Sequence, residues 1–348
     1  MAYISSSKPK VSVICSWFNR YESIEDTLAG LLAQSIDDYE IIIVNDGSTD
    51  ERVAAQLDRY ACKKLKVIHQ ENSGFTRAIK VAASVSKGEF LTVEGAGDLS
   101  HPRRLEIQAS LLQENTEVVL LGCIFEQKSP RSEHSTYWEE RALGSGTPPV
   151  HHYSKQQIMI RNPLGHGGTM FRKSCYMTVG GYRPAFHFAQ DYDLWLRMSE
   201  KGIVGRLELP LYRQFLFENS GVALNPKKRV EQGMYADLAR QAADQRAKFG
   251  TDIVEEIGDR AIGLRFATKR SASIEMKISG RYLFAGDFNR ARFWAWLAKK
   301  EQNGLRQVLV LATTILVSKA PWLMSFVPRR FAPTLAVKTE KSNDDAHI

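Results

Sequence analysis

The sequence has few cysteines and no long run of apolar residues. Its four cysteines, Cys15, Cys62, Cys123 and Cys175, form no Cys-x-x-Cys pair, so neither a disulfide framework nor a zinc site is predicted. A bilayer-spanning run of about 20 apolar residues is missing. Residues 1–10 are polar and have no apolar core of a signal peptide. We therefore expect a cytoplasmic protein with reduced thiols.

Positive charge is concentrated in the last third of the chain. Of 348 residues, 47 are basic and 39 acidic; residues 1–220 carry 25 and 26 of these, and residues 221–348 carry 22 and 13. Such an excess points to an anionic partner, either a membrane surface or a nucleic acid. Because no nucleic-acid-binding motif accompanies the charge, we expect peripheral membrane contact and no nucleic acid.

Short apolar runs alternate with helical stretches over the first ninety residues. Strands are expected at 11–15, 40–44, 65–69 and 89–93, and helices at 22–34 and 75–86. This order is typical of βαβ units that feed a parallel sheet. The turn at 45–50 offers Ser48 or Thr49 as the N-cap of the helix that follows.

Polar and turn residues follow each of these strands. Ser16, Asp46, Asn72 and the segment 94–98 occupy the four strand ends. In doubly wound sheets the ligand binds beyond the carboxyl ends of the strands, so we expect these residues to converge on one crevice. The alternative is that they form ordinary polar loops. No Gly-x-Gly-x-x-Gly follows the first strand, which argues against a dinucleotide site.

The rest of the chain changes character twice. A helix is expected from 101 to about 115 and a strand at 118–125, followed by a loop-rich insertion over 126–160 and a basic helical region beyond 222. The apolar segment 305–327 fits either an in-plane membrane helix or a buried C-terminal helix. The tail 338–348 is expected to be disordered.

Several motifs, taken in order, resemble family 2 glycosyltransferases. They are VSVI at 11–14, FNR at 18–20, EIIIVNDGSTD at 40–50, NSG at 72–74, KGEF at 87–90, GGY at 180–182 and DYDLWLR at 191–197. The resemblance implies an α/β domain of the GT-A, Rossmann-like nucleotide-diphospho-sugar transferase type over 1–220, followed by a helical region over 221–348. It also implies inverting transfer from a nucleotide sugar, with UDP-sugar the first expectation, to a saccharide or lipid-linked acceptor in cell-surface polysaccharide synthesis.

The resemblance assigns donor-binding roles to residues of the first strands. Asp46 matches the aspartate that reads the nucleobase, although an Asp in a turn is common. Ser16 and Phe18 match the base pocket, where an aromatic ring can stack on the base; Phe18 could instead belong to the core. Arg77 could reach a donor phosphate or could be a solvated helix charge.

The resemblance places the general base at Asp191. An inverting transferase needs a carboxylate to take the proton of the acceptor hydroxyl, and Gln190-Asp191 stands where the family has a Glu-Asp pair. Capping of the following helix is the alternative role of Asp191. Asp193 and Arg197 are spaced to pair on that helix. His166 is a candidate on the acceptor side, or a structural histidine.

The chain departs from the family at the metal site. Family members carry Asp-x-Asp-Asp where this chain has GAGD at 95–98. Asp98, with help from Glu94, could hold Mn²⁺ or Mg²⁺ on the donor diphosphate. Basic residues such as Arg77 could instead stabilise the leaving diphosphate. The remaining alternative is a non-catalytic module that binds a nucleotide sugar without turnover.

Overall fold

The chain divides into two compact units. The computed structural model describes residues 8–128, 148–217 and 226–326; the tail 338–348 lies outside them. One unit comprises Met1–Gly221 with Ala242–Ala261, and the other Val222–Gln241 with Ile262–Ile348. Residues 242–261 thus pack with the first unit, although the sequence placed them in the C-terminal region.

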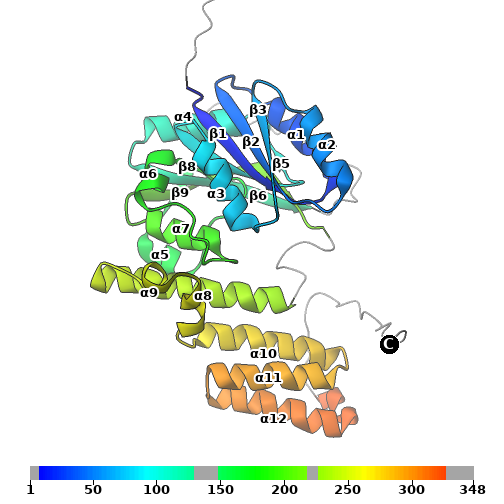
Figure 1. Cartoon of the computed structure of the whole chain (residues 1–348). Helices are drawn as coiled ribbons and strands as arrows, with labels where there is room; N and C mark the ends of the chain where they lie inside the picture. The colour runs from blue at the N-terminus through cyan, green and yellow to red at the C-terminus, as the bar shows by residue number, and fades with distance from the viewer. Residues whose placement is uncertain (1–7, 129–147, 218–225, 327–348) are drawn as a thin grey trace, which may run out of the picture. The chain divides into compact units, whose positions relative to one another are not determined.

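The first unit is built on one sheet (Figure 1). In the described part of the chain the strand order is β3-β2-β1-β4-β8-β6-β9-β5, with β7 paired to β9. The strands are β1 (Val11–Trp17), β2 (Tyr39–Asp46), β3 (Leu65–Gln70), β4 (Phe90–Gly95), β5 (Leu99–Ser100), β6 (Val118–Lys128), β7 (Val150–Tyr153), β8 (Met170–Arg172) and β9 (Ile203–Phe215).

Four strands form the expected parallel half of the sheet. β1 pairs in parallel with both β2 and β4, and β2 pairs in parallel with β3. β1 is an inner strand, and Val11, Val13, Ile14 and Cys15 are fully buried. Helices on both faces bury such a strand on two sides, which is why its sequence is a continuous apolar run.

Helices follow these strands at the expected places. They are η1 (Tyr21–Ser23), α1 (Ile24–Leu32), α2 (Glu51–Arg59), α3 (Phe75–Val85) and α4 (Arg104–Glu114). The N-cap of α2 is Asp50, whose carboxylate accepts from the backbone N–H of Arg52 at 3.0 Å. The predicted caps Ser48 and Thr49 were wrong because both side chains bond elsewhere: Ser48 Oγ donates to Asn45 and Thr49 Oγ1 to Asn19.

The second half of the sheet is mixed. β8 is antiparallel to β4 and β6, while β6 and β9 are parallel. The segment 126–160 is more ordered than expected: it contains the end of β6, β7, and α5 (Lys155–Ile160), which begins with a capping box between Ser154 and Gln157. Residues 129–147 lie outside the described part. Short helices α6 (Lys173–Thr178), α7 (Gln190–Met198) and α9 (Ile253–Ile257) complete this unit.

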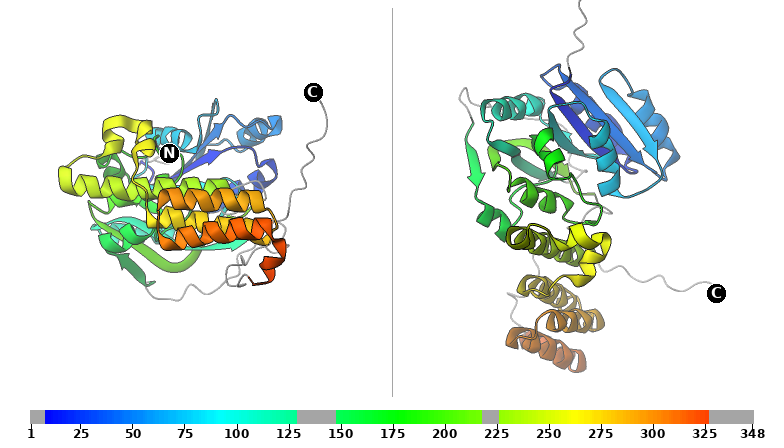
Figure 2. Two further views of the ribbon diagram at one scale, coloured as in Figure 1. Left: turned by 90° about the horizontal axis from the view of Figure 1, so that it is seen from below. Right: turned by 60° about the vertical axis from the view of Figure 1, so that its left-hand side comes forward.

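The second unit contains three consecutive helices that pack on one another (Figure 2). α10 (Lys269–Phe284), α11 (Phe288–Glu301) and α12 (Leu305–Lys319) lie side by side. The remaining elements of the C-terminal part are α8 (Pro226–Phe249), which runs from this unit into the first, and the 3₁₀ segments η2 (Gly258–Leu264) and η3 (Pro321–Phe326). Among the described residues, no helix combines the length and the apolarity that a membrane crossing requires.

The apolar segment 305–327 is only partly buried. Thr314 and Val317 of α12 are buried in the second unit. Leu305, Leu309 and Leu316 of the same helix are exposed. One face of α12 therefore packs on its neighbours, and its other face is an exposed apolar surface; residue 327 lies outside the described part.

Candidate active site

The parallel strands deliver their polar ends to one edge of the sheet. Ser16 of β1 is in register with Gly95 of β4, and Asp46 of β2 with Gln70 of β3. The side-chain amide of Asn72 donates to the carbonyl oxygen of Asp46 at 2.9 Å. The predicted convergence of these strand ends is confirmed.

A turn with left-handed backbone follows β1. Asn19 and Arg20 have φ of 56° and 57°, a conformation that costs a residue other than glycine about 1 kcal/mol. Asn19 Oδ1 accepts from the backbone N–H groups of Thr49 at 2.8 Å and Asp50 at 3.2 Å. These bonds tie the end of β1 to the turn after β2 and hold the strained turn in place.

Asp46 organises the loop that leads into α3. One carboxylate oxygen accepts from Gln70 Nε2 at 2.8 Å and the backbone N–H of Ser73 at 2.9 Å, and the other accepts from the N–H of Gly74 at 2.9 Å. The side chain is buried. The bonds to Ser73 and Gly74 fix the shape of this loop. The oxygen that is bonded to Gly74 can accept one further hydrogen bond, for example from a nucleobase.

Ser16 and Phe18 stand beside this loop. Ser16 is half-buried at the end of β1. Phe18 is 43% exposed, so it is not part of the core, which was the alternative for it. An exposed aromatic ring at the ligand-binding edge of a sheet is available to stack on a planar group.

Hydrogen bonds from strand β9 hold the loop 95–98 in place. Tyr212 donates its hydroxyl hydrogen to Asp98 at 2.7 Å and accepts from the N–H of Gly95 at 2.8 Å. The other oxygen of Asp98 accepts from the backbone N–H of Phe215 at 3.0 Å. Asp98 is 5% exposed, and burial raises its pKa to about 6 although both donors favour the ionised form. Its two oxygens therefore face the protein interior.

Glu94 is committed to a buried ion pair. Arg104 Nη1 lies 2.8 Å from Glu94 Oε2, and neither side chain is exposed. Ser100 donates to the same oxygen at 2.6 Å. Burial raises the pKa of Glu94 to about 7 against the charge of Arg104. The expectation that Glu94 could help to hold a metal is corrected, because its carboxylate faces a guanidinium inside the core.

The residues at this position do not fit a divalent cation. A Cβ on Gly95 would overlap Asp98 Oδ2, and one on Gly97 would lie 2.9 Å from Phe217 and 3.2 Å from Ser23, at a φ of +84°. The two carboxylates that the family has here would require Asp98 and Phe217 to move from their present positions. Within the described ranges, no three His, Cys, Asp or Glu side chains are grouped to hold a metal. A Mg²⁺ ion on a substrate diphosphate takes at least one protein carboxylate besides phosphate oxygens and water, and both oxygens of Asp98 are engaged by Tyr212 and Phe215 inside the protein.

Arg20 reaches the loop that lacks these carboxylates. Its Nη1 donates to the carbonyl oxygen of Ala96, and its guanidinium lies 4.5 Å from the centre of the Phe217 ring. Burial lowers the pKa of Arg20, and the negative charge of Asp98 opposes that shift. An arginine stays protonated even so, and the structure therefore places a fixed positive charge at the loop 95–98.

Asp191 is the second residue of α7. Its Oδ2 accepts from Asn162 Nδ2 at 2.9 Å, and among the described residues Oδ1 has no hydrogen-bond partner. The N-cap is Ala189, with a left-handed φ of 53°, so Asp191 does not cap the helix, which was the alternative role for it. A half-buried carboxylate with one oxygen held and one available is suited to accept a proton from a hydroxyl group.

His166 belongs to an aromatic wall close to Asp191. Its Nε2 lies 2.7 Å from the hydroxyl of Tyr182, and its ring makes edge contacts with Phe75 at 5.3 Å and Trp195 at 6.0 Å. Burial lowers the pKa of His166, and the charge of Asp191 acts in the opposite direction. Since Phe75 directly follows the loop held by Asp46, His166 connects the donor-side loop with the Asp191 side of the site.

Asp193 is a structural residue two positions after Asp191. It is fully buried between Arg197, at 2.7 Å, and Arg183, which confirms the predicted Asp193–Arg197 pair. Burial opposes its ionisation, but the two arginines hold the pKa of Asp193 below its usual value. Arg183 also binds Asp252, the N-cap of α9, at 2.8 Å. This network joins α7 to the segment 242–261.

Arg77 lies on the outside of α3. Its side chain is half exposed, with Nη2 3.8 Å from Asp259 and Nη1 3.4 Å from the carbonyl oxygen of Ser73. The exposed position agrees with the solvated-charge alternative.

Sequence reasoning missed three residues that shape the site. Arg20 stood in the quoted FNR motif but was given no role. Asn162 and Tyr212 had no signal near them, because each reaches the site from a distant segment: Asn162 is 29 residues from Asp191, and Tyr212 is 114 residues from Asp98.

Several known proteins are similar to this chain in sequence or in fold. A model of the family described as glycosyl transferase family 2 matches residues 12–175. EpsE of Bacillus subtilis (strain 168), provisionally named a glycosyltransferase, is 31% identical over 218 residues, covering 60% of this chain and 73% of EpsE. The amylovoran biosynthesis glycosyltransferase AmsE of Erwinia amylovora is 27% identical over 197 residues, covering 55% of this chain and 70% of AmsE.

Two solved structures are similar over most of the chain. TarS residues 1–349 of S. aureus, in complex with UDP, gives a TM-score of 0.51 at 14% identity and covers 85% of this chain and 92% of that one. The mannosyltransferase PcManGT of Pyrobaculum calidifontis, in complex with GDP-Man and Mn²⁺, gives 0.50 at 16% identity, covering 94% and 85%. At these identities the likeness concerns the fold.

Proposed function

We propose a reaction for this chain, which belongs to glycosyl transferase family 2 and is a glycosyltransferase with a GT-A fold and a helical C-terminal region. It transfers one sugar at a time, with inversion, from a nucleoside diphosphate sugar to an acceptor hydroxyl. The observation that carries the proposal is the carboxylate of Asp191, with one oxygen bonded to Asn162. A carboxylate held on one side can take the acceptor proton on the other.

Residues at the carboxyl ends of the parallel strands are proposed to bind the nucleotide of the donor. Phe18 offers an exposed ring for a nucleobase and Asp46 an acceptor for a base N–H, while Ser16 lies near the end of β1, in register with Val44 of β2. UDP-sugar is the first donor to test and a GDP-sugar the second, because the two similar structures hold UDP and GDP-Man.

The chemical step follows from these positions. The acceptor oxygen forms a bond to the anomeric carbon while its proton passes to Asp191. The bond between that carbon and the diphosphate oxygen breaks, and its electron pair stays on the nucleoside diphosphate. Attack opposite the leaving group inverts the configuration. The half-buried setting of Asp191 beside the aromatic wall of His166 and Trp195 limits water around the base.

The acceptor is proposed to be a saccharide, free or lipid-linked, in the assembly of a cell-surface polysaccharide. The relative AmsE is named for the biosynthesis of amylovoran, and this name supports that setting. Contact with a membrane would bring the enzyme to a lipid-linked acceptor at the cytoplasmic face.

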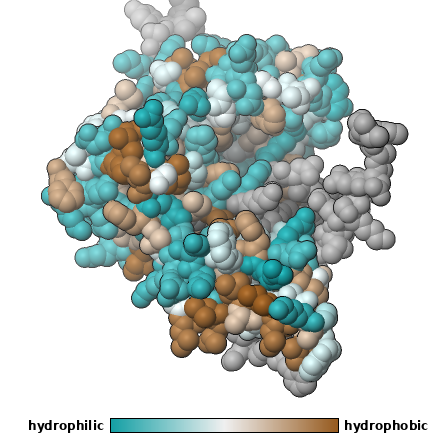
Figure 3. All heavy atoms as spheres, turned by 60° about the horizontal axis from the view of Figure 1, so that its bottom comes forward, coloured by the Kyte–Doolittle hydropathy of each residue, from teal (hydrophilic) through white to brown (hydrophobic). Residues whose placement is uncertain are grey.

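The second unit carries a surface suited to such contact. Phe293 and Trp296 of α11, with Leu309, Ile315 and Leu316 of α12, are exposed; we call these five residues the apolar face. Figure 3 shows hydrophobic side chains gathered next to hydrophilic ones in the lower part of the view. Apolar side chains flanked by positive charge are typical of helices that lie in an anionic membrane interface.

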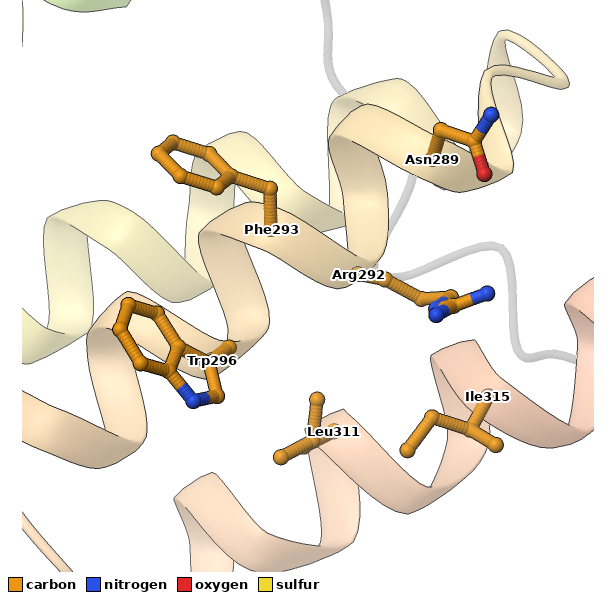
Figure 4. A pocket seen from close by; sticks show the side chains of 6 residues that line it. All are labelled: Asn289, Arg292, Phe293, Trp296, Leu311 and Ile315. Carbon is orange, nitrogen blue, oxygen red and sulfur yellow. The ribbon is translucent and has the colours of Figure 1, made fainter.

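A groove opens between the two helices of the apolar face (Figure 4). It measures about 340 Å³ and is lined by Asn289, Arg292, Phe293 and Trp296 from α11 and by Leu311 and Ile315 from α12. Residues 269–326 contain ten Lys or Arg against three Asp or Glu. This charge complements an anionic bilayer, so we assign the face to the headgroup region of such a membrane.

Transfer is tested with Asp191→Asn. Release of UDP or GDP is measured over a panel of nucleotide sugars with lipid-linked saccharide acceptors. The wild type is expected to turn over one donor, and the variant to bind that donor while its turnover falls about 10²- to 10⁴-fold. Full activity of the variant would remove Asp191 as the base. Donor binding by the wild type without turnover on any acceptor would favour a non-catalytic nucleotide-sugar-binding module.

A further inference from the structure

We propose that Arg20 supplies the positive charge on the donor diphosphate, so that this enzyme binds its nucleoside diphosphate without a divalent cation. The inference rests on the proposed function, because it assumes that the sheet edge binds a nucleoside diphosphate. It concerns one part of that site, the loop 95–98, where the chain has glycines in place of the family's carboxylates.

Packing around the loop 95–98 suits glycine at both positions. A Cβ at Gly95 would meet Asp98 and the Tyr212 hydroxyl, and a Cβ at Gly97 would meet Phe217, so a side chain at either place would require these neighbours to move. Asp98 is turned inward by Tyr212 and Phe215. The loop 95–98 therefore directs no carboxylate toward a cation on the diphosphate, which would need at least one such ligand besides phosphate oxygens and water.

The backbone directs the guanidinium of Arg20 at the loop 95–98. The left-handed turn at Asn19 and Arg20 is held by Thr49 and Asp50, and it aims the side chain of Arg20 at the loop, where Nη1 bonds to the carbonyl oxygen of Ala96. A strained backbone conformation that the surrounding structure enforces is characteristic of functional sites.

The guanidinium of Arg20 keeps N–H donors for a ligand. A guanidinium has five N–H donors, and in the described part of the chain Arg20 uses them for one hydrogen bond, to Ala96. Phe217 covers one face of the group at 4.5 Å, which leaves donors at the edge of the plane. Edge donors of arginine bind two phosphate oxygens at once.

Arg77, the basic residue expected to take this role, is placed less well. Its half-exposed side chain faces Asp259 at 3.8 Å, whereas Arg20 is partly buried at the loop itself. A charge in a partly buried site acts more strongly on a leaving group than one in water. Because the guanidinium is fixed by the fold, it can stabilise the negative charge that collects on the departing diphosphate.

The test is calorimetric titration of the full chain with UDP and GDP, in EDTA and in MnCl₂. The wild type is expected to bind one of them equally in both buffers. Arg20→Gln is expected to weaken diphosphate binding about tenfold to a hundredfold and to leave the affinity for the nucleoside, uridine or guanosine, unchanged. Arg20→Lys should restore part of the loss, and Arg77→Gln, the matched control, should bind like the wild type.

Three results would overturn the inference. Binding by the wild type that requires Mn²⁺ would show that a cation does hold the diphosphate, and this measurement needs no variant. Unchanged diphosphate affinity in Arg20→Gln, with a wild-type melting curve, would remove Arg20 from the site. Absence of nucleotide binding in both buffers would overturn the proposed function as well, and is distinguished from the first two because no titration gives a signal.

Discussion

At position 98 the fold holds a carboxyl group whose pKa is higher in the folded protein than in the unfolded chain. Asp98 is buried under the loop 95–98 and bonded to Tyr212 and Phe215, and burial raises its pKa to about 6 from an ordinary 3.8. Between these two pH values the unfolded chain loses the proton and the folded protein keeps it. The free energy of unfolding therefore falls as the pH rises from 4 to 6, by up to about 3 kcal/mol from this residue.

Asp98→Asn is expected to flatten this dependence. The amide cannot ionise, so urea unfolding at pH 4 and at pH 6.5 should differ less in the variant than in the wild type. Glu94, whose pKa is raised to about 7, leaves a residual slope of the same sign. Glu114→Gln, on the exposed side of α4, is the control and should keep the wild-type slope. An unchanged slope in Asp98→Asn would show that Asp98 ionises as easily in the folded protein as in the unfolded chain.

Helix α7 carries two carboxylates with different roles. Asp191 is half-buried with one bond to Asn162, whereas Asp193 lies inside the protein between Arg183 and Arg197. The segment of α9 joins this network through Asp252, which binds both Arg183 and Arg246. Asp193 thus holds helix α7 in place, and removal of the acceptor proton is assigned to Asp191.

Substitution of each residue by Asn should separate the two roles. Asp193→Asn removes the carboxylate that pairs with the buried Arg197 and one of the two carboxylates that pair with Arg183, and is expected to lower the free energy of unfolding by about 3–5 kcal/mol. Asp191→Asn makes the same chemical change on the same helix and should cost less than about 1 kcal/mol, because its hydrogen bond to Asn162 can be kept. Thermal melting measures both. Equal losses in the two variants would contradict the assignment.

At the scale of the whole molecule, the basic excess and the apolar face occur in the same unit. A membrane interface that receives the apolar face would gain from burial of Phe293 and Trp296 and from positive charge near anionic headgroups. Each unit has its own core: the first surrounds the sheet, and the second is centred on Val230, Ile278 and Trp294. Changes on the apolar face are therefore expected to leave the sheet edge intact.

The double variant Phe293→Ser and Trp296→Ser should bind vesicles of phosphatidylglycerol and phosphatidylcholine about tenfold more weakly than the wild type, because both exposed rings lose apolar area to bury. Phe249→Ser removes an exposed ring of the first unit and is the matched control. Sedimentation with vesicles, with and without added salt, measures the binding. Equal binding of wild type and double variant would place the contact elsewhere.

The sequence by itself determined the alternation of strands and helices, the edge where polar residues meet, and the family. Short β-branched apolar runs such as 41–44 are typical of strands buried on both faces, and turn residues directly follow them, so local pattern was enough. It also separated the basic C-terminal part from a neutral first part, because net charge is a sum over residues and needs no coordinates.

Only the tertiary structure decided which of these residues face the site. Glu94 and Asp98 were candidate ligands by position, and packing turned one toward Arg104 and the other toward Tyr212. Arg20, in contrast, is turned toward the site, because a left-handed turn directs its side chain at Ala96. Partners such as Tyr212 and Asn162 come from segments far along the chain, and a local pattern contains no information about such contacts. Side-chain direction is set by those contacts, which form only when the sheet closes.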